Sequence, residues 1–508
     1  MSAIQFLLSL FILILSLLFI YFTLKKHESS NKSNSTLIPK SYPLIGSSFA
    51  IKANSDRRVQ WTSDILQTLS SPTFVLHRPM GSRQIFTADP DNVQHILKTH
   101  FHLYGKGPVS RHTLFDFLGN GIFNADGDTW KFQRQVASHE FSTKSLRKFV
   151  ETVVDTEINE RLVPILAEAA VSGTVLDFQD VLQRFAFDNV CKIAFGYDPA
   201  YLSPGLPPAP FAEAFEESVM IISDRFNRAF PIIWKIKKIL GIGSEKRLKE
   251  TMSQVRDFAM KMVQDKKQEL IETNSRTDDS VDLLSRFLNS GISDETFVTD
   301  VVISFILAGR DTTSAALTWF FWLIFRNPNI ETNILQEIQE INNLEENIFE
   351  EAKHMMYTHA SLCETMRLYP PVPVDSKTAK GDDVWPDGTP VRKGDRVTYH
   401  PYAMGRLEKL WGADWADFKP ERWLRQEDEK RSFVGRDPFS YPVFQAGPRV
   451  CLGKEMAFLQ MKRVVAGVLS RFKIVPADGH EFEPVFIAYL TNKMKGGFPV
   501  RVEERNKN

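Results

Sequence analysis

A single cysteine at the start of a long amphipathic segment constrains this chain more than any other feature. Cys451 lies in the sequence FQAGPRVCLG, residues 444–453, and an amphipathic run from Lys454 to Phe472 follows at once. N–H groups of such a loop and of the first helical turn would point at the sulfur, and the helix dipole favours its negative charge. The pattern therefore predicts a thiolate that can bind a metal.

The neighbouring residues of this loop support the same interpretation. Gly447 and Gly453 allow the backbone to approach a bound group closely, Phe444 can shield the sulfur, and Arg449 can reach an anionic group beside the metal. The alternative for a lone cysteine is a buried structural thiol. Three further motifs in the chain weigh against that alternative.

The first of these motifs lies in a long apolar segment from Phe297 to Phe325, with Ser293 and Asp294 before it as candidate caps and Pro328 after it. The segment predicts one helix of roughly 30 residues, about 45 Å long at 1.5 Å per residue. A helix of this length must cross the whole body of the protein.

The middle of this predicted helix contains the sequence AGRDTT, residues 308–313. Ala308 and Gly309 are small enough for a flat cofactor to lie against the backbone. Asp311 and Thr312 put an acid and an alcohol in an apolar stretch, where an acid is costly unless it is used or paired. A solvent-facing Asp311 with Thr312 bonded back to the helix is the alternative.

Two weaker motifs place charged residues on shared helical faces. Glu364 and Arg367 lie at i, i+3, and Trp130 and Arg134 lie at i, i+4, so each pair shares a face. Arg422 belongs to a downstream segment, FKPERW, residues 418–423. Each of these motifs taken alone fits an ordinary surface helix.

Taken together and in this order, the motifs resemble the cytochrome P450 family. The loop matches the family's haem-binding pattern F-x-x-G-x-R-x-C-x-G at every fixed position. The resemblance implies a mostly α-helical protein with small β-sheets, folded as a single haem domain. It also implies haem b as cofactor, with Cys451 as the axial ligand of the iron.

The resemblance also implies roles for the other motif residues. Asp311 and Thr312 would relay protons during oxygen activation, and Ala308 and Gly309 would flank the haem. The remaining implied roles are contact with the haem propionates, for Trp130, Arg134 and Arg449, and a buried structural triad behind the haem loop, for Glu364, Arg367 and Arg422.

Three longer segments, residues 303–322, 130–141 and 402–406, resemble the plant fatty-acid omega-hydroxylase group. The resemblance implies an NADPH- and O₂-dependent monooxygenase that hydroxylates the terminal carbon of an aliphatic chain, with a fatty acid as the leading substrate. Terminal hydroxylation of a sterol side chain or of a jasmonate–amino acid conjugate remains open, because all three substrates present an aliphatic terminus. Candidate walls of the substrate channel, by family position, are Phe115, Phe117, Phe305, Val372, Val374 and Leu490.

Two functions of other classes are disfavoured by the same residues. A haem-thiolate isomerase or lyase would lack the acid–alcohol pair that Asp311 and Thr312 provide. A non-enzymatic haem protein, such as a gas sensor, would not need the proton-relay and electron-transfer features.

The N-terminus predicts a membrane anchor. Ile4 to Leu24 is an uncharged apolar run of 21 residues, and a bilayer core needs ~20. Lys25 and Lys26 follow at once, which predicts that the body of the protein faces the cytosol. We therefore expect a transmembrane signal anchor over residues 1–24, a polar linker and proline hinge over 25–46 and the haem domain over 47–508, at the endoplasmic reticulum membrane. A cleavable signal peptide is the alternative.

Composition excludes one class of partner and leaves another to the family resemblance. Lysine plus arginine and aspartate plus glutamate number 62 each, so no global charge indicates nucleic acid. The three cysteines argue against a disulfide framework, and Cys191 and Cys363 are interpreted as buried apolar residues. The family resemblance implies NADPH–cytochrome P450 reductase as electron donor, docking beside Lys131, Lys454, Lys462 and Arg463.

Local patterns predict several further elements. Residues 74–87 fit a hairpin around Pro79-Met80-Gly81, and residues 146–169 and 245–272 fit helices, the first kinked or divided at Pro164. The segment from Pro231 to Leu240 combines lysines with apolar residues. It fits an interfacial helix on the membrane and a packed helix with a solvated lysine edge about equally well.

Overall fold

The computed structural model describes residue 16 and residues 38–505, except 229, 274–281, 292–293, 344–346 and 428–429. Residues Ser41–Asn508 form one compact unit, separate from Met1–Lys40. The expected membrane anchor, residues 1–24, lies outside the described residues apart from Ser16, and so does the cap candidate Ser293. No helix among the described residues has the length and hydropathy needed to cross a bilayer.

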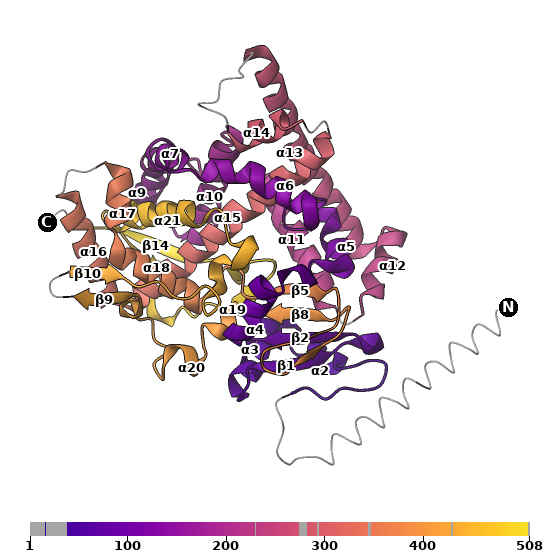
Figure 1. The fold of residues 1–508 in the computed structure, drawn as a ribbon. Helices are drawn as coiled ribbons and strands as arrows, with labels where there is room; N and C mark the ends of the chain where they lie inside the picture. The colour runs from indigo at the N-terminus through magenta and orange to yellow at the C-terminus, as the bar shows by residue number, and fades with distance from the viewer. Residues whose placement is uncertain are drawn as a thin grey trace. The chain divides into compact units, whose positions relative to one another are not determined.

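The compact unit is mostly helical with small sheets, which confirms the expected fold class (Figure 1). It begins at Ser41, so it includes residues 41–46, which we expected in the linker. The helices are α2 Ser48–Ala53, α3 Arg58–Thr68, α4 Pro90–Gln94, α5 Gly107–Leu118, α6 Gly127–Ser138, α7 Thr143–Lys148, α8 Asp155–Glu157, α9 Val163–Ser172, α10 Phe178–Phe195, α11 Pro210–Asn227, α12 Ile232–Leu240, α13 Gly243–Thr273, α14 Leu283–Asn289, α15 Glu295–Arg326, α16 Pro328–Asn342, α17 Ile348–His354, α18 Met356–Leu368, α19 Pro401–Met404, α20 Glu408–Trp411 and α21 Lys454–Leu469.

The largest described sheet has five strands in the order β1-β2-β8-β5-β3, where β2 and β8 run parallel and the other neighbours antiparallel. In Figure 1 it lies on the side of the body opposite α16 and α17. The bounds of the strands are β1 Thr73–His77, β2 Arg83–Thr87, β3 Tyr104–Gly105, β4 Leu176–Asp177, β5 Asp375–Ala379, β6 Asp383–Val384, β7 Pro390–Val391, β8 Arg396–Tyr399, β9 Leu424–Glu427, β10 Lys430–Phe433, β11 Phe472–Pro476, β12 Phe486–Ala488, β13 Asn492–Met494 and β14 Pro499–Glu504.

The first two strands confirm the predicted hairpin. β1 and β2 pair over five positions, from Thr73 opposite Thr87 to His77 opposite Arg83. The turn between them places Met80 and Gly81 at φ 59° and 74°. Glycine adopts this left-handed region readily, and for the non-glycine Met80 it is uncommon.

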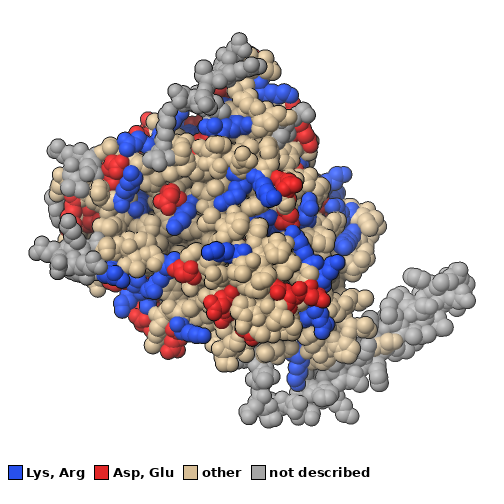
Figure 2. Space-filling view, viewed as in Figure 1, with Lys and Arg blue, Asp and Glu red and all other residues tan. Residues whose placement is uncertain are grey.

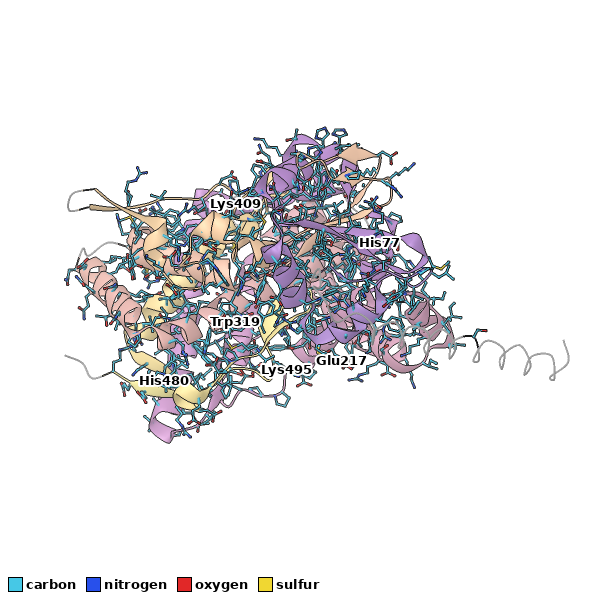
Figure 3. All side chains as sticks on the ribbon, turned by 90° about the horizontal axis from the view of Figure 1, so that it is seen from below. His77, Glu217, Trp319, Lys409, His480 and Lys495 are labelled. Atoms are coloured by element: carbon cyan, nitrogen blue, oxygen red, sulfur yellow. The ribbon has the colours of Figure 1, made fainter. Side chains whose placement is uncertain are left out.

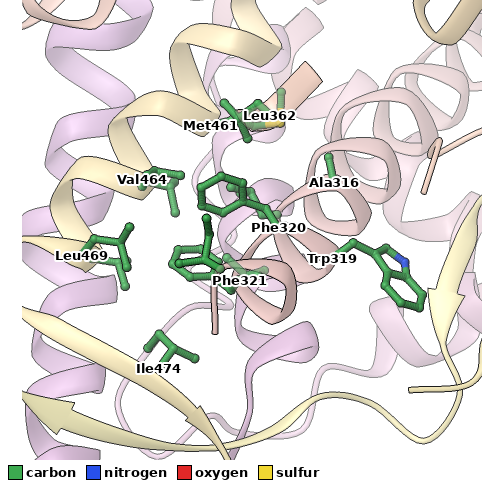
Figure 4. Close-up of a cluster of buried hydrophobic side chains, with 14 of the residues drawn as sticks. Ala316, Trp319, Phe320, Phe321, Leu362, Met461, Val464, Leu469 and Ile474 are labelled. Carbon is green, nitrogen blue, oxygen red and sulfur yellow. The ribbon is translucent and has the colours of Figure 1, made fainter. Parts of the chain in front are cut away.

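The long central helix is α15, which runs without a break over 32 residues. Asp294 caps it, because its side chain accepts a hydrogen bond from the N–H of Thr296. The C-terminal half of α15 enters the main hydrophobic core, where Phe320 and Phe321 face Val464 of α21 and Ile474 of β11 (Figure 4). Trp319 points the other way and stacks on Tyr369, with ring centroids 3.9 Å apart. One helix therefore packs on both sides within this core.

The segment predicted as one helix over residues 146–169 is more complex than expected. α7, α8 and α9 are joined by π-helical stretches over Phe149–Val154 and Ile158–Leu162. The second stretch ends just before α9, whose first turn contains Pro164. Proline has no N–H to donate, and a π turn changes the local hydrogen-bond register, so the chain remains helical across this proline.

The exposure of helix α12 bears on the two alternatives for residues 231–240. Trp234 is its one buried residue, whereas Ile232, Ile236 and Ile239 are exposed. On the face shown in Figure 2, lysine and arginine are interspersed with aspartate and glutamate.

Candidate functional site

A cavity of about 550 Å³ brings most of the predicted site residues together. Its lining includes Cys451 from the loop before α21 and Thr312 from the middle of α15. The other predicted residues in its lining are Phe444, Gly453, Arg449, Trp130, Arg134, Ala308 and Gly309. Residues more than 300 positions apart in the sequence therefore surround one space.

The loop that carries Cys451 is held by close backbone contacts. Its Cys451 N–H donates to the carbonyl of Phe444 at 2.8 Å. Gly447 has φ +64°, and a Cβ there would lie 2.1 Å from the carbonyl oxygen of Leu97. Only glycine fits at this position, because both the backbone conformation and the approach of Leu97 exclude a side chain. Gly453 has no such clash, with its nearest neighbours at 3.5 Å or more.

Cys451 lines the cavity and is exposed there. Burial raises its pKa, while the N–H of Gly453 and the cations of Arg134 and Lys454 act in the opposite direction. Phe444 packs on Phe458 of α21, with ring centroids 5.2 Å apart. The surroundings of the sulfur thus combine an aromatic shield with groups that favour a negative charge.

Two guanidinium groups flank Trp130 at the cavity wall. The Arg449 Cζ lies 4.5 Å from the ring centroid of Trp130, and the Arg134 Cζ lies 5.9 Å away. Arg449 also pairs with Asp126 at 2.7 Å. Arg134 donates to the carbonyl of Val450 at 2.8 Å and has no carboxylate partner within the described part of the chain. At least one cation at this wall is therefore available to an anionic group.

The acid–alcohol pair of α15 is split between two environments. The Thr312 hydroxyl lines the cavity and donates to the Ala308 carbonyl at 2.6 Å. Asp311 is 2% exposed and pairs with Arg310 at 2.8 Å, while its Oδ2 atom is buried without a hydrogen-bond partner. The back-bonded threonine of the alternative interpretation is thus present, but the aspartate does not face solvent.

Gly309 has a packing role that the sequence did not predict. It lines the cavity together with Ala308. A Cβ at Gly309, however, would lie 2.5 Å from a methyl carbon of Val190 in α10. The glycine therefore permits close packing of α15 on α10, in addition to any room that it leaves for a cofactor.

The structure brings the three residues of the expected triad together. Glu364 accepts from Arg367 at 2.8 Å through both carboxylate oxygens and from Arg422 at 3.2 Å. The Trp423 indole N–H donates to Glu364 at 3.0 Å. None of these three charged residues lines the cavity. One hydrogen bond links this cluster to the segment before the cysteine loop. Tyr441, three residues before Phe444, donates to the carbonyl of Cys363, which precedes Glu364, at 2.9 Å.

The expected channel walls divide into two groups. Phe305, Val372, Val374 and Leu490 line the cavity. Phe115 is 51% exposed, and Phe117 is fully buried against Phe215, so neither lines it. The reason is helical phase, since Leu114 and Leu118 of the same helix, α5, face the cavity instead.

The four expected docking residues also differ among themselves. Lys131 and Lys454 are exposed, and Arg463 pairs with Asp155 and Glu351. Lys462 does not belong to the surface, because it is 6% exposed and its ammonium donates to the Ala352 carbonyl at 2.8 Å. It lies on the inward side of α21, a position that a charge count cannot reveal.

Sequence analysis missed a hub beside the cysteine loop. Asp375 accepts from Lys377 at 2.5 Å, from Gln445 at 2.9 Å and from Tyr399 at 2.9 Å. Burial alone would raise the pKa of Asp375, but Lys106, Lys377 and these hydrogen bonds bring it below its usual range. Burial lowers the pKa of Lys106, which lines the cavity, to about 7. Only the spacing of Asp375 and Lys377 on alternate strand positions hinted at this pairing.

A metal-centred group with anionic edges fits this donor set. A thiol faces the cavity, Arg134 beside it has no carboxylate partner in the described residues, and Thr312 stands on another wall. Gly447 keeps the thiol-bearing loop close to the rest of the wall. The expected haem therefore agrees with the residues that are present.

Comparison with known proteins agrees with this arrangement. The protein-family model described as Cytochrome P450 matches residues 38–497. Cytochrome P450 94A2 of Vicia sativa is 62% identical over 484 residues, which cover 95% of this chain and 94% of the relative. Cytochrome P450 94A1 of Vicia sativa is 59% identical, covering 93% and 92%, and Cytochrome P450 94B1 of Arabidopsis thaliana is 47% identical, covering 94% and 93%.

Proposed function

Because the chain belongs to the cytochrome P450 family of monooxygenases, we propose that it hydroxylates the terminal carbon of an aliphatic chain, with a fatty acid as substrate. One observation carries this proposal. A single cavity joins Cys451 and Thr312 to apolar walls from Phe305, Val374 and Leu490. Such a space accepts a long apolar chain and leads it to the cysteine loop.

The cofactor of this proposal is haem b, held by residues that surround the cavity. Cys451 would bind its iron, Phe444 would shield the sulfur, and Ala308 and Gly309 would lie beside the ring. Trp130, Arg134 and Arg449 would bind the propionates. When bound, the haem supplies the reductive activation of O₂ that places one oxygen atom in a C–H bond.

The chain's own residues transfer protons and hold the proton-transfer groups in place. Thr312 holds a hydroxyl proton at an oxygen that faces the cavity. Asp311 is one residue away and keeps a free carboxylate oxygen, so the pair forms the proton relay. Arg310 holds Asp311 in place through the 2.8 Å ion pair. Glu364, Arg367 and Arg422 maintain the loop region from behind and take no part in the chemistry.

Terminal selectivity is a matter of geometry. A terminal C–H bond is stronger than its neighbours, so the protein must present the chain end and withhold the inner carbons. Apolar walls that confine the chain achieve this by positioning. Phe305 lies in α15 and Val374 lies just before β5. Both residues line the same cavity, so different parts of the chain confine the substrate.

The proposal includes a membrane location and an electron donor. Residues 1–24 anchor the protein in the endoplasmic reticulum membrane, and the exposed apolar residues of α12 rest at the bilayer surface with its lysines beside them. Ile239 is 84% exposed, which an interfacial helix explains. NADPH–cytochrome P450 reductase docks on the cysteine-loop side near Lys131 and Lys454.

The test is turnover by the full chain in yeast microsomes with a plant reductase and NADPH. Fatty acids, jasmonoyl-isoleucine and hydroxylated sterols are offered, and each product is mapped by mass spectrometry. A Cys451→Ala variant at matched protein level gives the background, and it should also lose the red-shifted absorption of the ferrous–CO complex.

We expect a terminal hydroxyl on fatty acids. If only the sterol or only the conjugate gained a terminal hydroxyl, the substrate assignment would change and the proposed reaction would stand. NADPH-independent rearrangement of a hydroperoxide would refute the monooxygenase reaction.

A further inference from the structure

Three arginines line one wall of the cavity, and none of them has a carboxylate partner among the described residues. Arg58 begins α3, Arg78 follows β1, which ends at His77 (Figure 3), and Arg396 begins β8. β2 and β8 are paired with Gln84 beside Arg396, so the three side chains come from adjacent parts of one wall. No described acidic side chain forms an ion pair with any of them.

Their hydrogen bonds go to uncharged acceptors. Arg58 donates to the side chain of Asn227 at 2.9 Å and to its carbonyl at 2.5 Å. Arg78 donates to Gln84 at 2.9 Å and to the Arg228 carbonyl at 3.2 Å. The Nε atoms of Arg58 and Arg396 are buried without any partner. The cluster therefore has unused donors as well as unbalanced charge.

The three positive charges repel one another, and burial further disfavours each of them. Burial first, and then the neighbouring arginines, lower the pKa of Arg58 to about 10 and that of Arg396 to about 9. The nearby acids do not offset this, because Asp224 pairs with Arg228 and Asp375 pairs with Lys377. An anion from outside the chain would stabilise these like charges in the cavity wall.

Other buried arginines of this protein behave differently. Arg225 pairs with Glu245, Arg310 with Asp311, and Arg367 with Glu364. Folding has thus supplied a carboxylate to each of these arginines. The wall that carries Arg58, Arg78 and Arg396 faces the cavity, where a ligand can supply one.

We propose that Arg58, Arg78 and Arg396 form the site that binds the carboxylate of the substrate, so that its opposite, aliphatic end is the one presented near Cys451. This inference rests on the proposed function and narrows it to acids. Guanidinium groups suit the role because their planar donors match a carboxylate in bidentate fashion. Phe226 lies beside the site, with the Arg396 Cζ 5.2 Å from its ring centroid, and offers an apolar surface to the chain that follows.

The experiment measures binding to the purified full-length holoprotein by equilibrium dialysis with radiolabelled ligands. Dodecanoate is compared with methyl dodecanoate, which has the same chain and no charge. Arg396→Gln and Arg58→Gln are compared with the matched control Arg57→Gln, which removes an exposed arginine one position away that pairs with Asp64. Haem content and the thermal midpoint are recorded for every variant.

We expect dodecanoate to bind wild type and Arg57→Gln alike, and to bind each cavity variant about ten- to a hundredfold more weakly. Methyl dodecanoate should bind wild type and cavity variants with similar affinity. Should a variant fail to fold, preference of the wild type for the acid over the ester still tests the site. Equal binding of acid and ester by the wild type would overturn the inference.

Two further readouts separate the possible occupants and the two proposals. Loss of haem content in Arg396→Gln, with no change in acid preference, would assign the cluster to a propionate and overturn the inference. Terminal hydroxylation of acid and ester alike would leave the proposed function standing without this site. Arginine-dependent binding of dodecanoate without hydroxylation would keep the site and refute the function. In active cavity variants, we expect products to shift from the terminal carbon to inner carbons, because the chain is no longer anchored.

Discussion

Two groups of buried and half-buried arginines in this protein have opposite electrostatic balances. Arg367 and Arg422 share Glu364, which accepts from both and from the indole of Trp423. Arg58, Arg78 and Arg396 line the cavity, and Arg58 and Arg78 donate to amide and carbonyl oxygens of neutral groups. The first group is completed by folding alone. The second is left incomplete by folding, which is what a binding site for an anion requires.

The comparison shows how the same side chain can serve stability in one place and recognition in another. A balanced guanidinium in the interior holds segments together, since removal of its partner leaves a buried charge. An unbalanced one reduces stability until a ligand arrives. Substitutions in the two groups should therefore change the free energy of unfolding in opposite directions.

The largest effect is expected at Glu364. Glu364→Gln keeps the shape but leaves Arg367 and Arg422 without a carboxylate, so it should lower the free energy of unfolding by ~3–5 kcal/mol. Urea unfolding measures this loss, and haem content should fall with it. Glu217→Gln is the matched control, because Glu217 pairs with Arg247 on an outer surface (Figure 3). A Glu364 variant as stable as that control would contradict the structural role.

A pH dependence of intermediate size is expected at His400. His400 follows β8, caps α19 through the Ala403 N–H at 3.0 Å and bonds Thr62 of α3 at 2.9 Å. Burial lowers its pKa from 6.5 to about 3. Between these values the unfolded chain binds a proton that the folded protein excludes, so stability is lost as pH falls below 6.5. This histidine alone should contribute a slope of up to about 1.4 kcal/mol per pH unit.

Urea unfolding across this pH range tests the contribution of His400 to stability. His400→Asn keeps an acceptor for the Ala403 N–H and cannot titrate, so its slope should be shallower than that of wild type. His359 is also buried, with its pKa lowered to about 3, and supplies the part of the slope that remains. His480→Asn, at an exposed position, is the control. An unchanged slope in His400→Asn would remove this histidine from the explanation.

The smallest effect, and the one of opposite sign, is expected at Arg396. Without ligand, Arg396→Gln should leave the free energy of unfolding unchanged or raise it by up to about 1 kcal/mol, because one of three repelling charges is gone. Thermal unfolding of the ligand-free protein measures this change. A marked loss of stability would show that Arg396 supports the fold, and the contrast with Glu364 would then disappear.

The sequence predicted those parts of the molecule that depend on local pattern. Cys451 and its glycines lie within ten residues, and α15 has a continuous apolar run with Asp294 before it, so both could be recognised directly. The cytochrome P450 resemblance added the partnership of Glu364 with Arg422, which spacing alone does not give. The mostly helical fold followed from the same family pattern.

The errors arose where a side chain's direction or a distant neighbour decides the outcome. Phe115 and Phe117 miss the cavity because α5 turns Leu114 and Leu118 toward it. Lys462 was placed at the surface by its charge, although its helix turns it inward to the Ala352 carbonyl.

The arginine cluster had no sequence signal at all. Arg58, Arg78 and Arg396 stand on a helix, a turn and a strand far apart in the chain. Nothing in their local sequences distinguishes them from arginines at the surface, and what sets them apart is that no described carboxylate forms an ion pair with them in the folded protein.

The close approach of α10 to α15 at Gly309 has a consequence for the evolution and engineering of this protein. A methyl group there would meet Val190 at 2.5 Å, so the separation of the two helices, and with it one dimension of the cavity, is set by a pair of small residues. Paired changes at 309 and 190 that conserve their combined volume could widen or narrow the chamber while leaving its reactive groups untouched. The size of substrate that the scaffold accepts would then be adjustable at two lining positions that carry no reactive group.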